Sequence, residues 1–297
     1  MPPIPPPTTE GITTTTELPL YWCRYTPSAS RGTLVVLHGG PGAHLDYLLP
    51  QMLELAHTRD VLLYDQRGGG RSKTDDRTPI TWRTHVEDLA AVLNELHDGP
   101  LTLVGYSWGA MLAMLYATEA AAGRVGPAPV RLVLINPAPL TRQWRAEFEA
   151  EFSRRMNGPE VVAMRAELAA SGLRELNPDA YKQRAFELSV AGYFADPSRT
   201  HDLTPFRVTG RVQQSTWESL GDFDLIPALK TVRVPALVVH GRQDPIPLSS
   251  AQACAAALGA EGVWLDECGH VPYVEQPEKL FAAIEGFLAR TEPTDHR

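Results

Sequence analysis

Short apolar runs rich in β-branched residues alternate with longer amphipathic stretches along most of this 297-residue chain. Such alternation is typical of parallel strands, because each pair of parallel strands needs a crossover connection that is usually a helix. The expected strands are residues 33–37, 61–64, 101–105, 130–135, 236–240 and 262–265. The expected helices are residues 45–57, 82–96, 108–122, 249–258 and 278–290. The sequence therefore predicts an α/β fold with a mostly parallel central sheet flanked by helices.

Residues 141–222 interrupt this alternation. They contain helical patches at 144–156, 160–170 and 179–190 but no apolar run that suits a core strand. We interpret them as a helical cap inserted into an α/β core of residues 18–140 and 223–297. The first seventeen residues are rich in proline and threonine, and we interpret them as an N-terminal arm outside the core, with a polyproline-like and mobile stretch at residues 1–7.

Composition argues against several classes of protein. With 43% hydrophobic and 21% charged residues the chain suits a soluble globular protein, and its apolar runs fall far short of the ~20 residues of a membrane span. A net charge of −8 without a basic patch does not suit nucleic-acid binding. The N-terminus lacks a secretory signal, and Cys23, Cys254 and Cys268 show no zinc or dithiol spacing. We expect a cytoplasmic protein with no metal or cofactor, and with neither membrane nor nucleic acid as partner.

The strongest chemical signal is the sequence Gly-Tyr-Ser-Trp-Gly at residues 105–109, a G-x-S-x-G motif. It follows an expected strand and precedes an expected helix, which is the setting of a nucleophilic serine at a sharp turn. Glycines flank such a serine because side chains there would collide with the neighbouring strand and helix. The pattern predicts that Ser107 is a nucleophile.

A serine hydroxyl needs a base, and the base needs a carboxylate to orient it. Downstream of such a serine the acid comes first and the histidine second. Asp244 lies just after the strand expected at 236–240, and His270 lies just after the strand expected at 262–265. Asp266 is the alternative acid, but it lies only four residues before the histidine. We predict Ser107, His270 and Asp244 as the catalytic group.

An oxyanion formed at Ser107 needs backbone N–H donors. One is expected from Trp108, the residue after the nucleophile, and one from the loop His-Gly-Gly-Pro-Gly at residues 38–42. Because Pro41 has no N–H group, Gly40 is the preferred second donor.

Three separate segments resemble the prolyl aminopeptidases (proline iminopeptidases) of the α/β-hydrolase superfamily. Residues 38–42 resemble their HGGPG loop, residues 65–72 (Asp-Gln-Arg-Gly-Gly-Gly-Arg-Ser) their DQRGxGRS segment, and residues 105–109 their GxSWG motif. The resemblance implies an α/β-hydrolase fold and release of N-terminal proline, or another small residue, from short peptides without a metal. It also implies that residues 65–72 brace the loops beneath the site and are not catalytic.

An aminopeptidase must bind the ammonium group of its substrate in a mostly dry pocket, which requires a carboxylate. Members of the family supply acidic residues from the cap, but the corresponding place here falls near the neutral pair Gln213 and Gln214. Glu218 and Glu187 are the cap residues that could substitute as substrate-binding groups.

Three functional interpretations follow. The first is a prolyl-aminopeptidase-like serine hydrolase acting on short peptides. The second is a carboxylesterase, lactonase or amidase that uses the same three residues on a small uncharged substrate. The third, a non-catalytic binding protein, is disfavoured because Ser107, Asp244 and His270 are all present. Haloalkane dehalogenases and epoxide hydrolases are disfavoured as well, since they use an aspartate nucleophile. The sequence carries no indication of the oligomeric state.

Overall fold

The computed structural model describes residues 4–292, and its core is one eight-stranded sheet with the strand order β1-β2-β4-β3-β5-β6-β7-β8. Strands β3 to β8 are parallel to one another, whereas β2 is antiparallel to both β1 and β4. This confirms the predicted α/β fold with a mostly parallel sheet. The strands are β1 (Thr9–Ile12), β2 (Tyr21–Tyr25), β3 (Thr33–Leu37), β4 (Asp60–Tyr64), β5 (Thr102–Tyr106), β6 (Arg131–Ile135), β7 (Ala236–Gly241) and β8 (Glu261–Leu265).

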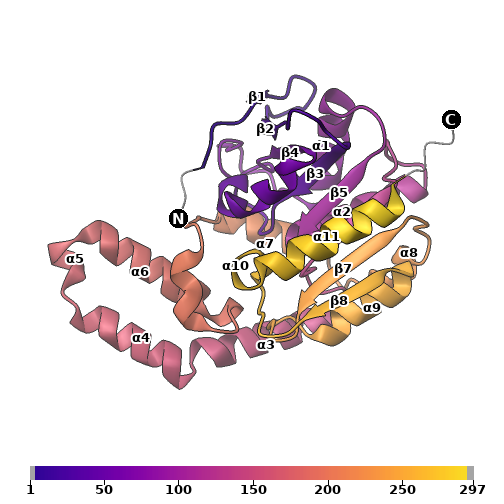
Figure 1. The fold of residues 1–297 in the computed structure, drawn as a ribbon. Helices are drawn as coiled ribbons and strands as arrows, with labels where there is room; N and C mark the ends of the chain where they lie inside the picture. Colours follow the sequence, from indigo (N-terminus) through magenta and orange to yellow (C-terminus); the bar gives the residue numbers. More distant parts are fainter. Residues whose placement is uncertain (1–3, 293–297) are drawn as a thin grey trace.

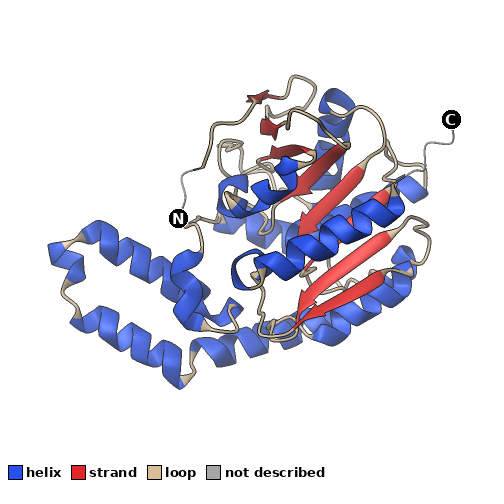
Figure 2. Ribbon diagram, in the orientation of Figure 1, coloured by secondary structure: helices blue, strands red, loops and turns tan. Residues whose placement is uncertain are grey.

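Both faces of the sheet are buried, which is why the central strands are almost continuously apolar. In β3, Leu34 and Val36 point to one face while Val35 and Leu37 point to the other. One face packs against α1 (Trp82–Leu96), α2 (Trp108–Ala121), α8 (Ile226–Leu229) and α9 (Leu248–Leu258). The opposite face packs against η2 (Gln51–His57) and α11 (Pro277–Thr291), so the core has three layers (Figures 1 and 2).

The helix predicted at residues 45–57 is not continuous. It consists of two short 3₁₀ helices, η1 (Leu45–Leu48) and η2, separated by Leu49 and Pro50. Proline lacks the N–H group that would continue the helical hydrogen bonds, so the segment keeps its apolar spacing but does not form one continuous helix. The other predicted core helices are found within one or two residues of their expected ends.

The interpretation of residues 1–17 as an arm outside the core is wrong for the described part of that segment. Strand β1 pairs with β2, and β2 was itself not predicted. The threonine-rich stretch after β1 is fixed to α1, because the backbone N–H groups of Thr14 and Thr15 donate to the Glu95 carboxylate at 2.8 and 2.9 Å. Residues 1–3 lie outside the described part.

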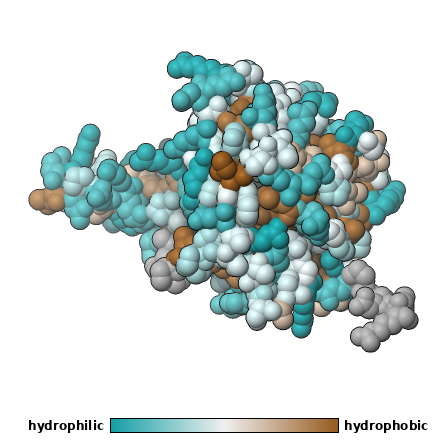
Figure 3. Space-filling view, turned by 90° about the horizontal axis from the view of Figure 1, so that it is seen from above, coloured by the Kyte–Doolittle hydropathy of each residue, from teal (hydrophilic) through white to brown (hydrophobic). Residues whose placement is uncertain are grey.

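Between β6 and β7 the chain leaves the sheet and forms the helices α3 (Arg142–Met156), α4 (Pro159–Ala170), α5 (Leu173–Leu176), α6 (Pro178–Val190), η3 (Ala191–Tyr193), η4 (Pro197–Asp202) and α7 (Gly210–Ser219). We call these helices the cap. The two ends of the cap meet at an antiparallel bridge between Thr141 and Asp224. Helices α4, α5 and α6 project away from the core (Figure 1), and their outward surface is largely hydrophilic (Figure 3). The cap therefore leaves and re-enters the core at one place.

Candidate active site

Ser107 lies at the sharp turn between β5 and α2, with φ 55° and ψ −116°. A positive φ is uncommon for a residue other than glycine, and here close packing enforces it. A Cβ atom at Gly105 would lie 2.4 Å from the carbonyl oxygen of Gly109, and one at Gly109 would lie 2.1 Å from that of Leu37. Both flanking glycines are thus required by the packing of the turn, as the motif predicts.

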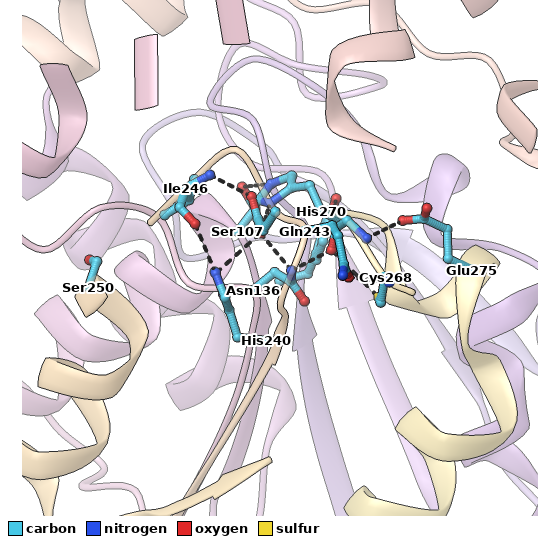
Figure 4. Close-up of polar contacts among 12 residues, drawn as sticks. Ser107, Asn136, His240, Gln243, Ile246, Ser250, Cys268, His270 and Glu275 are labelled. Carbon is cyan, nitrogen blue, oxygen red and sulfur yellow. Dashed lines mark hydrogen bonds and ion pairs between the residues drawn. The ribbon is translucent and has the colours of Figure 1, made fainter. Parts of the chain in front are cut away.

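The structure brings His270 to this serine (Figure 4) and Asp244 to the other side of the His270 ring, each from a loop far away in the sequence. His270 Nε2 lies 2.9 Å from Ser107 Oγ, and His270 Nδ1 lies 2.7 Å from Asp244 Oδ2. An ionised carboxylate only accepts hydrogen bonds, so Nδ1 carries the proton and Nε2 of the neutral ring is free to accept from the Ser107 hydroxyl. Such a chain can transfer the hydroxyl proton to histidine.

Asp244 is buried, and its carboxylate is held by several groups. Asn136 Nδ2 donates to Oδ2 at 2.6 Å, and the backbone N–H of Ile246 donates to Oδ1 at 2.7 Å. Burial alone would raise the pKa of this carboxyl, but the neighbouring His270 and His240 and the hydrogen bonds hold it below its ordinary value. Asp244 is therefore a fixed negative charge against the histidine ring.

His270 is oriented from both the core and the cap. Its backbone N–H donates to the carbonyl oxygen of Tyr193 in η3 at 2.7 Å, and the ring of Tyr193 stacks on the imidazole with 5.1 Å between centroids. From the core, the Tyr106 hydroxyl donates to the carbonyl oxygen of His270 at 3.0 Å. His270 is thus held between Tyr106 of β5 and Tyr193 of the cap.

The backbone N–H groups predicted to bind an oxyanion are available. Gly40 and Trp108 both line the cavity in front of Ser107, and neither amide has an acceptor within residues 4–292. Trp108 is the first residue of α2, where the helix leaves N–H groups free. By contrast, the N–H of Gly39 donates to the Tyr47 hydroxyl at 2.7 Å and is not free.

Ser107 opens into a cavity of about 340 Å³ between the core and the cap. Aromatic and aliphatic side chains dominate its wall, and they come both from the core and from the segment between β6 and β7, which contributes Phe148, Phe186 and Phe206. Its volume and its apolar lining are typical of a small-molecule site.

Residues 34–284 match the sequence model of the alpha/beta hydrolase family. The chain belongs to this family.

Several proteins similar to this alpha/beta hydrolase are named for proline iminopeptidase activity. A proline iminopeptidase from Lactobacillus delbrueckii subsp. bulgaricus is 26% identical over 281 residues, covering 90% of this chain and 93% of the relative. The structure of a Mycobacterium smegmatis proline iminopeptidase matches with a TM-score of 0.69 at 22% identity, covering 95% of this chain and 98% of the other. The structure of a proline iminopeptidase-related protein from Thermus thermophilus matches with a TM-score of 0.70 at 24% identity, covering 95% of this chain and 97% of the other. The predicted resemblance is confirmed, and the two structures agree with the fold.

The cap carboxylates that were candidates for binding a substrate amine do not reach the cavity of this alpha/beta hydrolase. Glu187 is buried but turned toward its own helix, where Arg184 and Gln183 donate to it. Glu218 is exposed on α7 and accepts from Gln214 at 2.7 Å. No carboxylate lines the cavity within the described part of the chain. The prediction of Glu187 and Glu218 as substrate-binding residues is therefore corrected, because helical spacing does not reveal which face a cap helix turns inward.

Asp266, the alternative acid, also lies elsewhere. Its side chain is 76% exposed and pairs with Arg242 at 2.9 Å. The segment at residues 65–72 makes bracing contacts: Asp65 accepts from the backbone N–H groups of Leu45 and Arg71, both at 2.8 Å. Gln66 accepts from Trp108 Nε1 at 2.9 Å, which ties this segment to the residue after the serine.

Several residues of the site were not found from the sequence. Asn136 contacts Asp244, which lies 108 positions later in the sequence. The sequence shows only an asparagine directly after an expected strand, and in the structure this residue has a positive φ of 42°. Tyr193 and Glu275 hold the His270 loop, and Arg145 places a guanidinium in the cavity wall. None of the four belongs to a motif of fixed spacing.

The described residues offer no obvious metal centre. Nowhere in residues 4–292 do three or more His, Cys, Asp or Glu side chains gather so that they could hold a metal ion. The three cysteines are free and buried, and burial raises the pKa of each thiol. Over the same residues, no helix is both long and apolar enough to cross a membrane.

Proposed function

We propose that this protein is a serine hydrolase in which Ser107 forms an acyl-enzyme, His270 is the general base and acid, and Asp244 orients the histidine. The chain of hydrogen bonds from Ser107 through His270 to Asp244 carries the proposal. The hydroxyl loses its proton to Nε2 as Oγ bonds to the substrate carbonyl carbon. The resulting oxyanion accepts hydrogen bonds from the N–H groups of Gly40 and Trp108.

Collapse of the tetrahedral intermediate then breaks the bond to the leaving group, which takes the proton from His270. Water, deprotonated by the same histidine, attacks the acyl-enzyme. As the bond from Oγ to the acyl carbon breaks, His270 returns that proton to Oγ, which releases the carboxylic acid and restores the Ser107 hydroxyl. In each half of the reaction His270 accepts one proton and then returns it, so this mechanism requires no metal or cofactor.

The substrate that the cavity suits best is a small ester, lactone or amide without a positive charge. The apolar wall favours an apolar acyl group, and an ammonium group would find no carboxylate there within the described residues. Release of N-terminal proline is the second candidate, and similarity to proteins named proline iminopeptidase favours it.

Turnover of matched substrates separates the two candidates. We expect short-chain aryl esters to be hydrolysed faster than a proline arylamide, and acetylation of the proline nitrogen not to reduce the rate, because no carboxylate among the described residues lines the cavity to pair with the amine. The Ser107→Ala variant should lose all but background activity on every substrate. A strong preference for the free amine over its N-acetyl analogue would favour the peptidase. More than a few per cent of activity in Ser107→Ala would remove Ser107 from the mechanism.

A further inference from the structure

The charge in the cavity wall is positive. Arg145, on the first cap helix α3, is the one side chain with a permanent charge among the described residues that line the cavity. Its side chain is only 21% exposed. An arginine remains charged when partly buried, so it needs an anionic partner or hydrogen-bond acceptors.

The guanidinium of Arg145 is fixed in place by an aromatic stack. It lies over the ring of Trp217, 3.8 Å from the centroid, and Trp217 packs edge-to-face on Trp108 at 5.7 Å. Trp108 is the residue after the nucleophile, so two indole rings connect the cation to the serine turn. A cation held by an aromatic face is oriented before a ligand arrives, which lowers the entropy lost on binding.

The ion pair of Arg145 leaves most of its donors free. One nitrogen, Nη2, lies 2.8 Å from a carboxylate oxygen of Glu149, whose side chain is 56% exposed and lies toward solvent. A guanidinium has five N–H donors, and no other hydrogen-bond partner of this one occurs within residues 4–292. The remaining donors can bind a carboxylate from within the cavity.

A second unused donor lies in the same cavity. The hydroxyl of Tyr193 has no partner among the described residues. Burial raises the pKa of this phenol to about 12, which Asp244 also favours and the charge of Arg145 opposes. The phenol therefore keeps its proton at neutral pH and can donate it to an anion.

We propose that Arg145 is a specificity-determining residue that binds a carboxylate on the substrate, so that this hydrolase acts on esters or amides that carry an acid group. The inference rests on the proposed function, because it concerns the cavity in which Ser107 would act. It reverses the charge preference expected of an enzyme that selects a substrate amine.

The test of binding uses a pair of esters that differ only in charge. Monomethyl adipate carries one carboxylate, and dimethyl adipate carries none. In the Ser107→Ala variant, which cannot turn them over, we expect the mono-ester to bind at least tenfold more tightly, measured through tryptophan fluorescence because Trp217 lies beneath the guanidinium. Adding Arg145→Gln should remove that difference. Arg142→Gln, a matched change of an exposed arginine outside the cavity wall, should preserve it.

The test of turnover uses otherwise wild-type protein. In Arg145→Gln we expect kcat/KM for monomethyl adipate to fall at least tenfold while that for dimethyl adipate stays within threefold, with Arg145→Lys intermediate. In a second pair, 4-carboxyphenyl butyrate carries the acid on the leaving group and 4-acetylphenyl butyrate is its uncharged partner. Comparing the two pairs shows whether Arg145 binds a carboxylate on the acyl group or on the leaving group.

Equal binding of the two adipates, or an equal loss of both in Arg145→Gln, would overturn the inference and leave the hydrolase proposal standing. Failure of a serine-directed phosphonate to label Ser107, together with no turnover of any ester, would overturn the hydrolase proposal. The binding measurement would still decide the role of Arg145.

Discussion

The backbone of Ser107 is held in a conformation that is unfavourable for any residue with a side chain. Strain of this kind costs on the order of 1–3 kcal/mol, so the surrounding packing must offset it. Two hydrogen bonds do so, from the Ser107 N–H to the carbonyl of Ile135 at 2.9 Å and from the Ala138 N–H to the carbonyl of Ser107 at 3.2 Å. The turn thus depends on β6, the neighbouring strand, as much as on its own sequence.

Asp244 is expected to act by fixing the tautomer of His270. Asp244→Asn should preserve the fold but lower kcat by roughly 10⁴-fold, because an amide can donate to Nδ1 and leave the proton on Nε2. The measurement is kcat on an aryl ester, with circular dichroism to establish folding. Asp266→Asn is the control, since that side chain is exposed and pairs with Arg242 away from the His270 ring. If the control were the more damaged variant, the acid would be Asp266.

At the scale of secondary-structure elements, the short helix α10 (Pro272–Glu275) connects the cap to the His270 loop. The Glu275 carboxylate accepts from the N–H of Gly269 at 2.8 Å and from that of Ala195, next to η3, at 2.7 Å. Arg199 of η4 adds hydrogen bonds to the carbonyls of Val274 at 2.7 Å and Glu275 at 3.0 Å. The Glu275 side chain therefore fixes both the loop that carries His270 and the part of the cap next to η3.

Loss of this connection should affect stability and turnover together. Glu275→Ala leaves two partly buried N–H groups without acceptors, so we expect the free energy of unfolding to fall by about 1–3 kcal/mol. Because the His270 loop is freed, kcat should fall as well, while Glu278→Ala, which alters an exposed glutamate on α11, should change neither. Urea denaturation and ester turnover measure the two effects. Unchanged stability in Glu275→Ala would show that water replaces the carboxylate.

At the scale of the whole molecule, buried neutral histidines link folding to pH. Burial lowers the pKa of His38 to about 4 and that of His85 to about 3. His85 lies between core and cap, with Nε2 3.2 Å from the Thr216 hydroxyl of α7. In the unfolded chain these rings take up a proton near pH 6.5, whereas in the folded protein they stay neutral until much lower pH. Their contribution to stability is therefore present above about pH 6.5 and is lost as the pH falls.

The dependence of the free energy of unfolding on pH measures this effect directly. As the pH falls from about 6.5 to the pKa of the folded protein, each such histidine should lower the free energy of unfolding by up to about 1.4 kcal/mol per pH unit. We expect urea denaturation between pH 7.5 and 5 to show this decline, and His85→Gln to make it shallower. His57→Gln, which changes an exposed side chain, should leave the slope as it is. An unchanged slope in His85→Gln would mean that His85 titrates normally in the folded protein.

Local sequence determined the parts of this protein that depend on near neighbours along the chain. The central strands follow from short apolar runs, and the turn at Ser107 follows from glycines two residues away on either side. Ser107, Asp244 and His270 each follow a strand, which places all three at the carboxyl edge of the parallel sheet, where the structure brings them together.

Only the tertiary structure decided which cap side chains face the cavity. The sequence favoured Glu187 and Glu218, yet the docked helices turn both away and present Arg145, which reverses the charge of the wall. Likewise, β1 becomes a strand because β2 offers it an edge, and Asn136 meets Asp244 because adjacent strands end side by side. Periodicity fixes which residues share a helix face, but the direction of that face is set by packing between segments far apart in the chain.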